Sequence, residues 1–140
     1  MESPSYTTFQ VGEYWLGVDA RRVQEVLRGE EPTEVPLSHP ALRGLINVRG
    51  QIVPVVDLAT RLGLASAAQP GPVACLLVRT AGGPVALVID WTSDLVGVHA
   101  DGVAPLPDHL PPAGRMLFHG AFRSADRVLF DLDVDQAAEL

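Results

Sequence analysis

Residues 44–64 of this chain read GLINVRGQIVPVVDLATRLGL, and this stretch decides the fold. Two apolar runs, LINV and IVPVV, flank the pair Arg49-Gly50. Short apolar runs rich in Val and Ile are typical of β-strands, and a Gly between them suits the positive φ of a tight turn. The stretch therefore predicts a hairpin of residues 44–48 and 51–56, with Arg49-Gly50 at or near its turn. One helical turn over 58–62 should follow and end at Gly63.

The composition fits a compact, mainly β protein. The chain has 140 residues, of which 47% are apolar and 19% charged, so it can bury a core. Its 13 glycines and 12 prolines favour frequent turns and short strands. Further hairpins are expected at 6–11 with 14–19, at 73–80 with 85–91, and at 115–122 with 127–133, and single strands at 24–28 and 95–99. Asp19 should cap a helical turn over 20–23, and Asp133 or Asp135 should cap a short closing helix.

The two halves of the chain are similar to each other. Each begins with a hairpin that ends in an apolar residue followed by Asp, and each continues through a Pro-rich loop to a second hairpin. Gly44 opens that second hairpin 13 positions before Asp57, and Gly120 opens its counterpart 13 positions before Asp133. The repeat of about 65 residues is far longer than a solenoid period and indicates duplication.

Duplication predicts two small β-barrels within one domain of residues 1–140. The approximate lobes are 6–64 and 73–140, joined near 63–72, with terminal strands open to exchange. Neither lobe alone buries much surface, so the two should pack together and leave a groove between them. The positions expected inside are Val53, Val55, Ile89 and Leu129.

Charge and cysteine usage restrict the partners and the compartment. The formal net charge is −7 and the chain contains no lysine, so nucleic acid and anionic membranes are not expected as partners. No apolar run reaches the ~20 residues of a membrane span, and the first residues lack the features of a secretory signal. A single cysteine, Cys75, fits a reducing compartment. The expectation is a cytoplasmic protein without direct membrane insertion.

No group of residues predicts catalysis. The four histidines lack metal-ligand spacing with one another or with Cys75, which lies in the middle of a strand and should be a buried structural thiol. Asp57, Asp90 and Asp133 each follow an apolar run, which favours helix capping over acid–base chemistry. Nucleotide-binding, metalloprotease and nucleophile-elbow motifs are absent from the sequence. We therefore expect no enzyme activity, no metal and no cofactor.

Arg49 has two interpretations from the residues alone. As a polar residue at a turn, it would be solvated and contribute little. As a lone Arg between apolar strands, it could bridge a lobe interface through its several donors. The sequence leaves both open.

The same stretch strongly resembles the CheW family of bacterial chemotaxis coupling proteins. The family core is G-x-x-N-[LV]-R-G-x-[IV]-[IV]-P-[IV]-[VI]-[DN]-L. The matching residues here are Gly44, Asn47, Arg49, Gly50, Pro54, Asp57 and Leu58. The resemblance extends back through FQVGEYWLGVD and VQEVLR and forward through VALVIDWTSDLVGV and RVLFDLD, so it spans nearly the whole chain.

This resemblance implies an all-β fold of two SH3-like five-stranded barrels packed around a shared apolar seam. It also implies a non-enzymatic adaptor that links the cytoplasmic tip of methyl-accepting chemoreceptors to the regulatory domain of a CheA-like histidine kinase. The residues implied to contact receptor or kinase are Ala20, Val23, Glu25, Arg49, Gly50 and Ala86. The residues implied to maintain the motif's structure are Gly44, Asn47, Pro54 and Asp57.

Two features depart from the family pattern and bear on the partner rather than on the fold. Trp91 follows Asp90 where a small or basic residue is usual, and the 101–115 loop is unusually rich in Pro. Two alternative functions therefore stay open. One is a CheW-like adaptor in a non-flagellar pathway, such as surface motility or gene regulation. The other is a sensor that holds a small ligand in the groove between the lobes.

Overall fold

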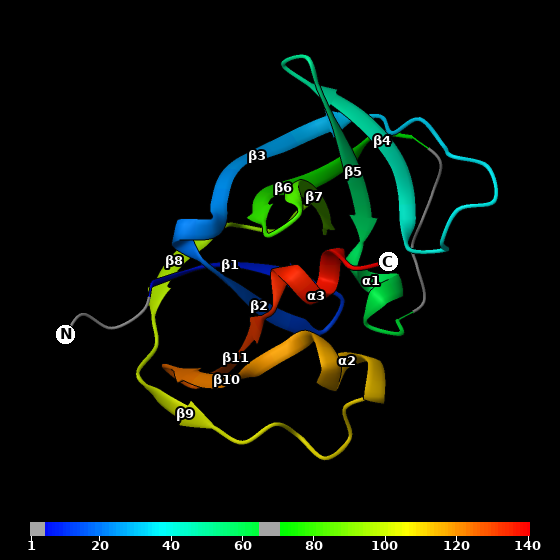
Figure 1. Ribbon diagram of the computed structural model, residues 1–140. Coiled ribbons are helices and arrows are strands. Elements are labelled where there is room, and N and C mark those ends of the chain that lie inside the picture. The colour runs from blue at the N-terminus through cyan, green and yellow to red at the C-terminus, as the bar shows by residue number, and fades with distance from the viewer. Residues whose placement is uncertain (1–4, 65–70) are drawn as a thin grey trace.

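The computed structural model describes residues 5–64 and 71–140, which form two β-sheets with short helices at their ends (Figure 1). The six-stranded sheet has the order β8-β1-β2-β11-β10-β9. Its strands are β8 (Val96–His99), β1 (Ser5–Val11), β2 (Tyr14–Asp19), β11 (Arg127–Leu132), β10 (Phe118–Ser124) and β9 (Gly102–Ala104).

The five-stranded sheet has the order β3-β6-β7-β5-β4. Its strands are β3 (Val23–Glu30), β6 (Val73–Thr80), β7 (Gly83–Ile89), β5 (Gln51–Asp57) and β4 (Leu42–Val48). The helices are a 3-10 turn η1 (Ala20–Arg22), α1 (Leu58–Arg61), α2 (Pro112–Leu117) and α3 (Val134–Ala138).

Each sheet combines strands from both halves of the chain, so its composition differs from the approximate lobes 6–64 and 73–140. The β1–β2 hairpin pairs with β8 and, in parallel, with β11. The β6–β7 hairpin pairs with β3 and, in parallel, with β5. The leading hairpin of each half is thus exchanged into the sheet of the other half. The junction expected near 63–72 lies largely outside the described residues, because the structure does not describe 65–70.

The backbone confirms the internal repeat in detail. The register shifts between Leu42 and Gly44 in one half and between Phe118 and Gly120 in the other. Asp57 N–H donates to the Ala41 carbonyl at 2.7 Å, and Asp133 N–H donates to the Leu117 carbonyl at the same distance. Both contacts join residues three positions before the repeated glycine to the aspartate thirteen positions after it. The two sheets are therefore copies of one design.

Strand β4 and its counterpart in the repeat, β10, are each paired along their outer edge, but with different partners. On the five-stranded sheet, Thr33 forms an isolated bridge with Leu45, with two backbone hydrogen bonds of 2.9 Å. This bridge connects the segment after β3 to β4 and so closes the sheet on itself. On the six-stranded sheet the equivalent place is taken by β9, whose Ala104 pairs with Ala121. That extra strand explains why this sheet has six strands where five were expected.

Most of the buried apolar residues form one cluster between the sheets. It includes Phe9 and Leu16 from the six-stranded sheet and Leu76 and Leu87 from the five-stranded one, all at most 1% exposed. A second, smaller cluster fills the five-stranded sheet with residues Ile46, Val53, Val55, Val73, Cys75, Leu77 and Ala86. Strand β6 is buried on both faces because it contributes to both clusters. The shared apolar seam is confirmed, as is the burial of Val53, Val55, Ile89 and Leu129.

Two local expectations need correction. Residues 115–117 were expected to begin a strand, but they end helix α2, which starts with Pro112. Proline is favoured in the first turn of a helix because its missing N–H is not needed there. Asp90 was expected to cap a helix, but the residues directly after it, 91–95, are not helical. Its carboxyl instead accepts a backbone hydrogen bond from Gly12, and its carbonyl accepts from Ser93 N–H.

Candidate functional site

The β4–β5 hairpin presents Arg49 at its tip. Arg49 has φ of +49° and Gly50 of +86°, so both turn residues are left-handed, as a two-residue type I′ turn requires. Asn47 fixes this turn, because its Oδ1 accepts a hydrogen bond of 2.8 Å from Gly50 N–H. The three specified residues of the N-x-R-G motif, Asn47, Arg49 and Gly50, thus form one turn that holds the arginine in a defined place.

At that place the Arg49 guanidinium forms an ion pair with Glu25 of strand β3. The hydrogen bond to Glu25 raises the pKa of Arg49 above its ordinary value. The Arg49 side chain remains 71% exposed and that of Glu25 33% exposed, so the pair is accessible to a partner. Glu25 lies in the five-stranded sheet and Arg49 in the turn between two of its strands, which means that Arg49 does not bridge the two lobes. It links the hairpin tip to β3 within one lobe.

Gly44 and Pro54 support the hairpin from its base. Gly44 has φ of +144°, and a Cβ at this position would lie 2.3 Å from the Thr33 carbonyl oxygen. Only glycine permits the close approach that closes the sheet. Pro54 faces Leu45, whose N–H and carbonyl are both bonded to Thr33. The missing N–H of Pro54 therefore costs no hydrogen bond with β4.

Asp57 ends the hairpin and starts helix α1. It is 5% exposed, and its Oδ1 accepts a hydrogen bond from Thr60 N–H at 3.4 Å. Asp133 caps α3 in the same way, accepting from Gln136 N–H at 3.1 Å. The expected capping role of Asp57 is confirmed, and of the two candidates for the closing helix the cap is Asp133.

The other expected contact residues fall into two groups. Ala20 begins η1, and Val23 begins β3, where it packs partly buried against the main core. Both are close in sequence to Glu25 and lie on the same continuous segment. Ala86 is different, because it is fully buried inside the five-stranded sheet. Its side chain offers no surface to a partner, and the structure does not bring it together with the ion pair.

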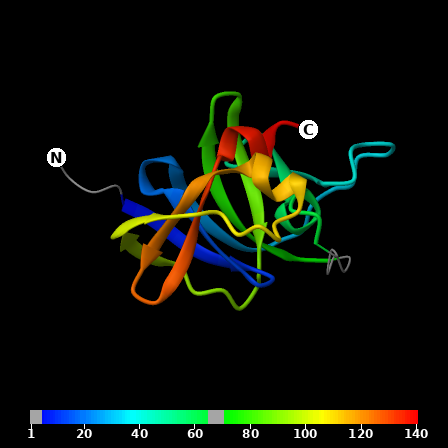
Figure 2. The same ribbon diagram turned by 90° about the horizontal axis from the view of Figure 1, so that it is seen from below.

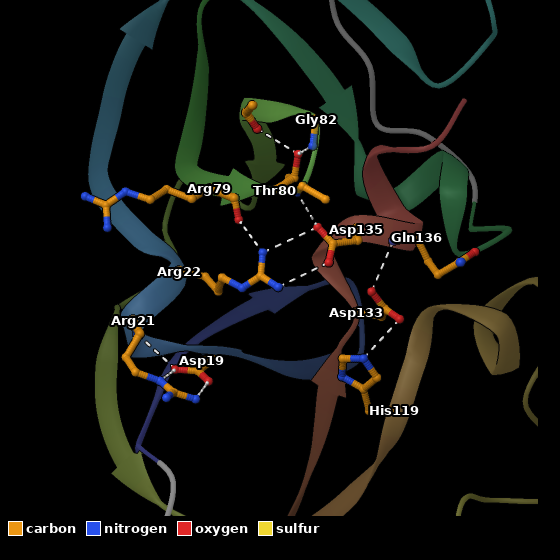
Figure 3. A network of polar contacts seen from close by, with 12 residues as sticks. Asp19, Arg21, Arg22, Arg79, Thr80, Gly82, His119, Asp133, Asp135 and Gln136 are labelled. Carbon is orange, nitrogen blue, oxygen red and sulfur yellow. Dashed lines mark hydrogen bonds and ion pairs between the residues drawn. The ribbon is translucent and has the colours of Figure 1, made fainter.

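A polar network at the junction of the lobes was not anticipated from the sequence (Figure 3). Arg22 of η1 donates to Asp135 of α3 at 3.1 Å and to the Arg79 carbonyl at 3.0 Å. Asp135 also accepts from Ala81 N–H at 2.8 Å, in the turn between β6 and β7. Figure 2 shows α3 lying beside that hairpin. One carboxylate thus holds together the C-terminal helix, an exchanged hairpin and the segment that leads into β3.

His119 lies next to this network. Its Nε2 is 3.0 Å from Asp133, and its Nδ1 is 3.7 Å from Asp131 (Figure 3 shows the first contact). Burial raises the pKa of Asp131, although His119 and the Tyr6 hydroxyl act in the opposite direction. Burial and the neighbouring Asp131 carboxylate raise the pKa of Tyr6 to about 12. These groups neighbour a pocket of about 130 Å³.

The described residues contain no group of three or more His, Cys, Asp or Glu side chains placed to hold a metal ion. Cys75 is buried, and burial raises the pKa of its thiol to about 12. A nucleophilic cysteine needs a lowered pKa, so this thiol is structural. Among the same residues, no helix is long and apolar enough to cross a membrane.

The fold and these side chains together define a class of protein: a duplicated, hairpin-exchanged β scaffold with an exposed ion pair at one lobe. The model of the CheW-like domain family matches residues 5–140. The chain therefore belongs to the CheW-like domain family, which includes the non-enzymatic CheW scaffolds.

Individual relatives agree with this assignment. Chemotaxis protein CheW of Klebsiella aerogenes is 22% identical over 131 residues, which cover 94% of this chain and 79% of that protein. The protein of the same name from Thermotoga maritima is 26% identical, covering 94% and 85%. Protein FrzA of Myxococcus xanthus is 36% identical over 104 residues, or 74% of this chain and 61% of FrzA. The crystal structure of the scaffolding protein TtCheW from Thermoanaerobacter tengcongensis matches with a TM-score of 0.83 at 21% identity, over 99% of this chain and 94% of that one.

Proposed function

We propose that this chain is a cytoplasmic adaptor that couples chemoreceptors to a CheA-like histidine kinase in chemotaxis signalling. The receptor's cytoplasmic tip would contact the surface around Glu25 and Arg49, and the kinase would contact another part of the scaffold through its regulatory domain. Family membership supports the coupling role. The observation that carries the placement of the receptor contact is the exposed Glu25–Arg49 pair.

Three features of this pair suit recognition. The type I′ turn and Asn47 hold Arg49 in one position, so a partner does not have to order a loose loop. Arg presents a planar fork of donors, and Glu25 leaves part of this fork available to another acceptor. Ile52, on the same hairpin, is 60% exposed and adds apolar surface. Arginine is enriched among the residues that anchor interfaces, and neighbouring contacts keep water away from such anchors.

The experiment compares two partners with one substitution. Arg49→Ala should weaken the affinity for a receptor-tip fragment about thirtyfold, as loss of a central Arg anchor does, while affinity for the kinase regulatory domain falls much less. Arg123→Ala, which removes an exposed arginine from the six-stranded sheet, is the matched control and should leave receptor affinity unchanged. The melting temperature of each variant confirms that it is folded.

A charge exchange separates direct contact from local support. The double variant Glu25→Arg, Arg49→Glu keeps an ion pair between the same two positions but reverses its direction. If Arg49 contacts the receptor itself, this variant should stay folded, but its affinity for the receptor fragment should remain as low as that of Arg49→Ala. Full recovery of receptor affinity would show that the pair only braces the hairpin. Wild-type receptor affinity in Arg49→Ala would refute the placement altogether.

A further inference from the structure

The interiors of the two sheets differ at equivalent positions. Val18 of β2 and Ile89 of β7 both precede the Asp after an exchanged hairpin, and they pair with Thr7 and Ala74. Three positions along each strand from these reference pairs, Gln10 pairs with Trp15 in β1–β2, and Leu77 pairs with Ala86 in β6–β7. These two cross-strand pairs are therefore equivalent. In the same way, the pair of Thr8 and Gly17 is equivalent to the pair of Cys75 and Val88.

These positions fill the five-stranded sheet with apolar side chains. Cys75, Leu77 and Ala86 are at most 2% exposed and belong to its interior cluster. In the six-stranded sheet the equivalent Thr8, Gln10 and Trp15 line an open cavity of about 410 Å³. An apolar filling stabilises a lobe, whereas polar groups in an interior are costly unless they are satisfied. Natural proteins tend to depart from the most stable arrangement at functional sites, so the six-stranded sheet, with its polar lining, is the candidate.

The segment between β7 and β8 forms one wall of the cavity, and hydrogen bonds hold this segment in place. Ser93 is 6% exposed, and its Oγ accepts a hydrogen bond of 2.8 Å from Gln10 N–H. From the other side, Arg28 of β3 donates to the Trp91 carbonyl at 2.6 Å and to the Ser93 carbonyl at 3.1 Å. The segment is therefore held by both sheets, and it carries Asp90, Thr92 and Asp94 at the cavity.

The charges of the lining favour a cation. Arg127 is the one basic side chain among the described residues that line the cavity, and it is already engaged. Its guanidinium lies 4.2 Å from the centre of the Trp15 ring and donates to Gln10 Oε1 at 3.2 Å. Within the described residues neither Asp90 nor Asp94 forms an ion pair. The lining thus keeps an excess of negative charge, in a chain whose net charge is −7.

We propose that this cavity is a binding site for a small organic cation with a guanidinium group. A planar guanidinium can donate two parallel hydrogen bonds to a carboxylate while its face packs on a flat neighbour. The cavity offers the carboxylates of Asp94 and Asp90 and the ring of Trp15. The volume lies within the range of small-molecule sites, which is roughly 300–1,000 Å³. The site is separate from the Glu25–Arg49 surface, since none of its lining residues belongs to that surface.

The test is a titration followed by NMR. The chain has only two tryptophans, Trp15 in the lining and Trp91 on the wall segment, so their indole N–H signals report on this region. N-acetyl-arginine amide is the probe, and N-acetyl-citrulline amide is its uncharged near-isostere. The arginine compound should shift the Trp15 signal saturably, and the citrulline compound should bind at least tenfold more weakly. Added salt should weaken the arginine compound, because the attraction is between charges.

Variants and further probes decide the outcome. Within the described residues, the wall segment bonds to the Asp94 carbonyl and not to its exposed carboxylate. Asp94→Asn should therefore leave the wall intact and weaken binding at least fivefold. Asp108→Asn, an exposed aspartate outside the lining, should have no effect. Equal binding of arginine and citrulline compounds, preference for N-acetyl-glutamate amide, or an unchanged affinity in Asp94→Asn would each overturn the proposal. Tighter binding of a glycine-flanked arginine pentapeptide would overturn the small-molecule assignment.

Discussion

Replacing Gly44 by Ala tests how the five-stranded sheet is closed. A Cβ at this position would lie 2.3 Å from the Thr33 carbonyl oxygen and 2.7 Å from its carbonyl carbon, both backbone atoms. Relief of this clash requires Thr33 to move, which breaks its two 2.9 Å hydrogen bonds with Leu45. Two backbone hydrogen bonds contribute about 1 kcal/mol each, and a non-glycine residue at a strained positive φ costs about 1–3 kcal/mol. We expect a loss of about 3–5 kcal/mol, a large share of a typical domain stability of about 5–15 kcal/mol.

The matched control is Gly50→Ala. Gly50 also has a positive φ, of +86°, but a Cβ there meets nothing within 4 Å. It should therefore show only the cost of the left-handed conformation, about 1–2 kcal/mol. Urea unfolding followed by tryptophan fluorescence and by circular dichroism gives both free energies of unfolding. If Gly44→Ala is no more destabilising than Gly50→Ala, the bridge to Thr33 does not hold the sheet closed, and our explanation of the glycine is wrong.

Three further predictions concern the core and the helix ends. The hydrogen bond from Ala81 N–H and the contact with Arg22 lower the pKa of Asp135. Asp135 therefore stabilises the fold above its ordinary pKa of 3.8, and this stabilisation is lost as the pH falls through the lower pKa of the folded state. In Asp135→Ala the midpoint of urea unfolding should depend less on pH in this acidic range. Cys75 should not react with a thiol reagent in native protein at pH 8 and should react fully in urea, because burial raises its pKa to about 12; fast native labelling would contradict this. Asp133→Ala should cost about 1 kcal/mol of stability, as loss of an N-cap does, and an unchanged urea midpoint would show that the cap is dispensable.

The parts of the fold that the sequence predicts are those with local causes. The β4–β5 hairpin follows from two apolar runs around a glycine, and the cap at Asp57 follows from a carboxylate placed directly before a helical turn. The repeat was visible because Gly120 and Asp133 in the second half have the same spacing as Gly44 and Asp57 in the first. The exchange of hairpins was not predictable in the same way. The pairing of β2 with β11 depends on contacts between distant segments that leave no local pattern.

The candidate site shows the same division. The resemblance named Glu25 and Arg49 separately, and the structure joins them in one ion pair. Ala86 was named as a contact residue, but small side chains fit both a surface and a tight interior, and the structure places it inside. Arg22 and Asp135 were missed because 113 positions separate them. The sequence did contain one indication of this contact. Asp133 alone is enough to cap the closing helix, so Asp135, two residues later, was available for another role.

The proposed coupling of a receptor to a kinase by this chain is best tested by reconstitution. The receptor-tip fragment, a CheA-like kinase with its regulatory domain and this chain are mixed, and both complex formation by analytical ultracentrifugation and kinase autophosphorylation are measured. We expect a complex that contains all three components, and a change in kinase activity that requires both receptor and adaptor and is lost with Arg49→Ala. Binding to only one partner, or a receptor effect on the kinase that is the same with and without this chain, would contradict it.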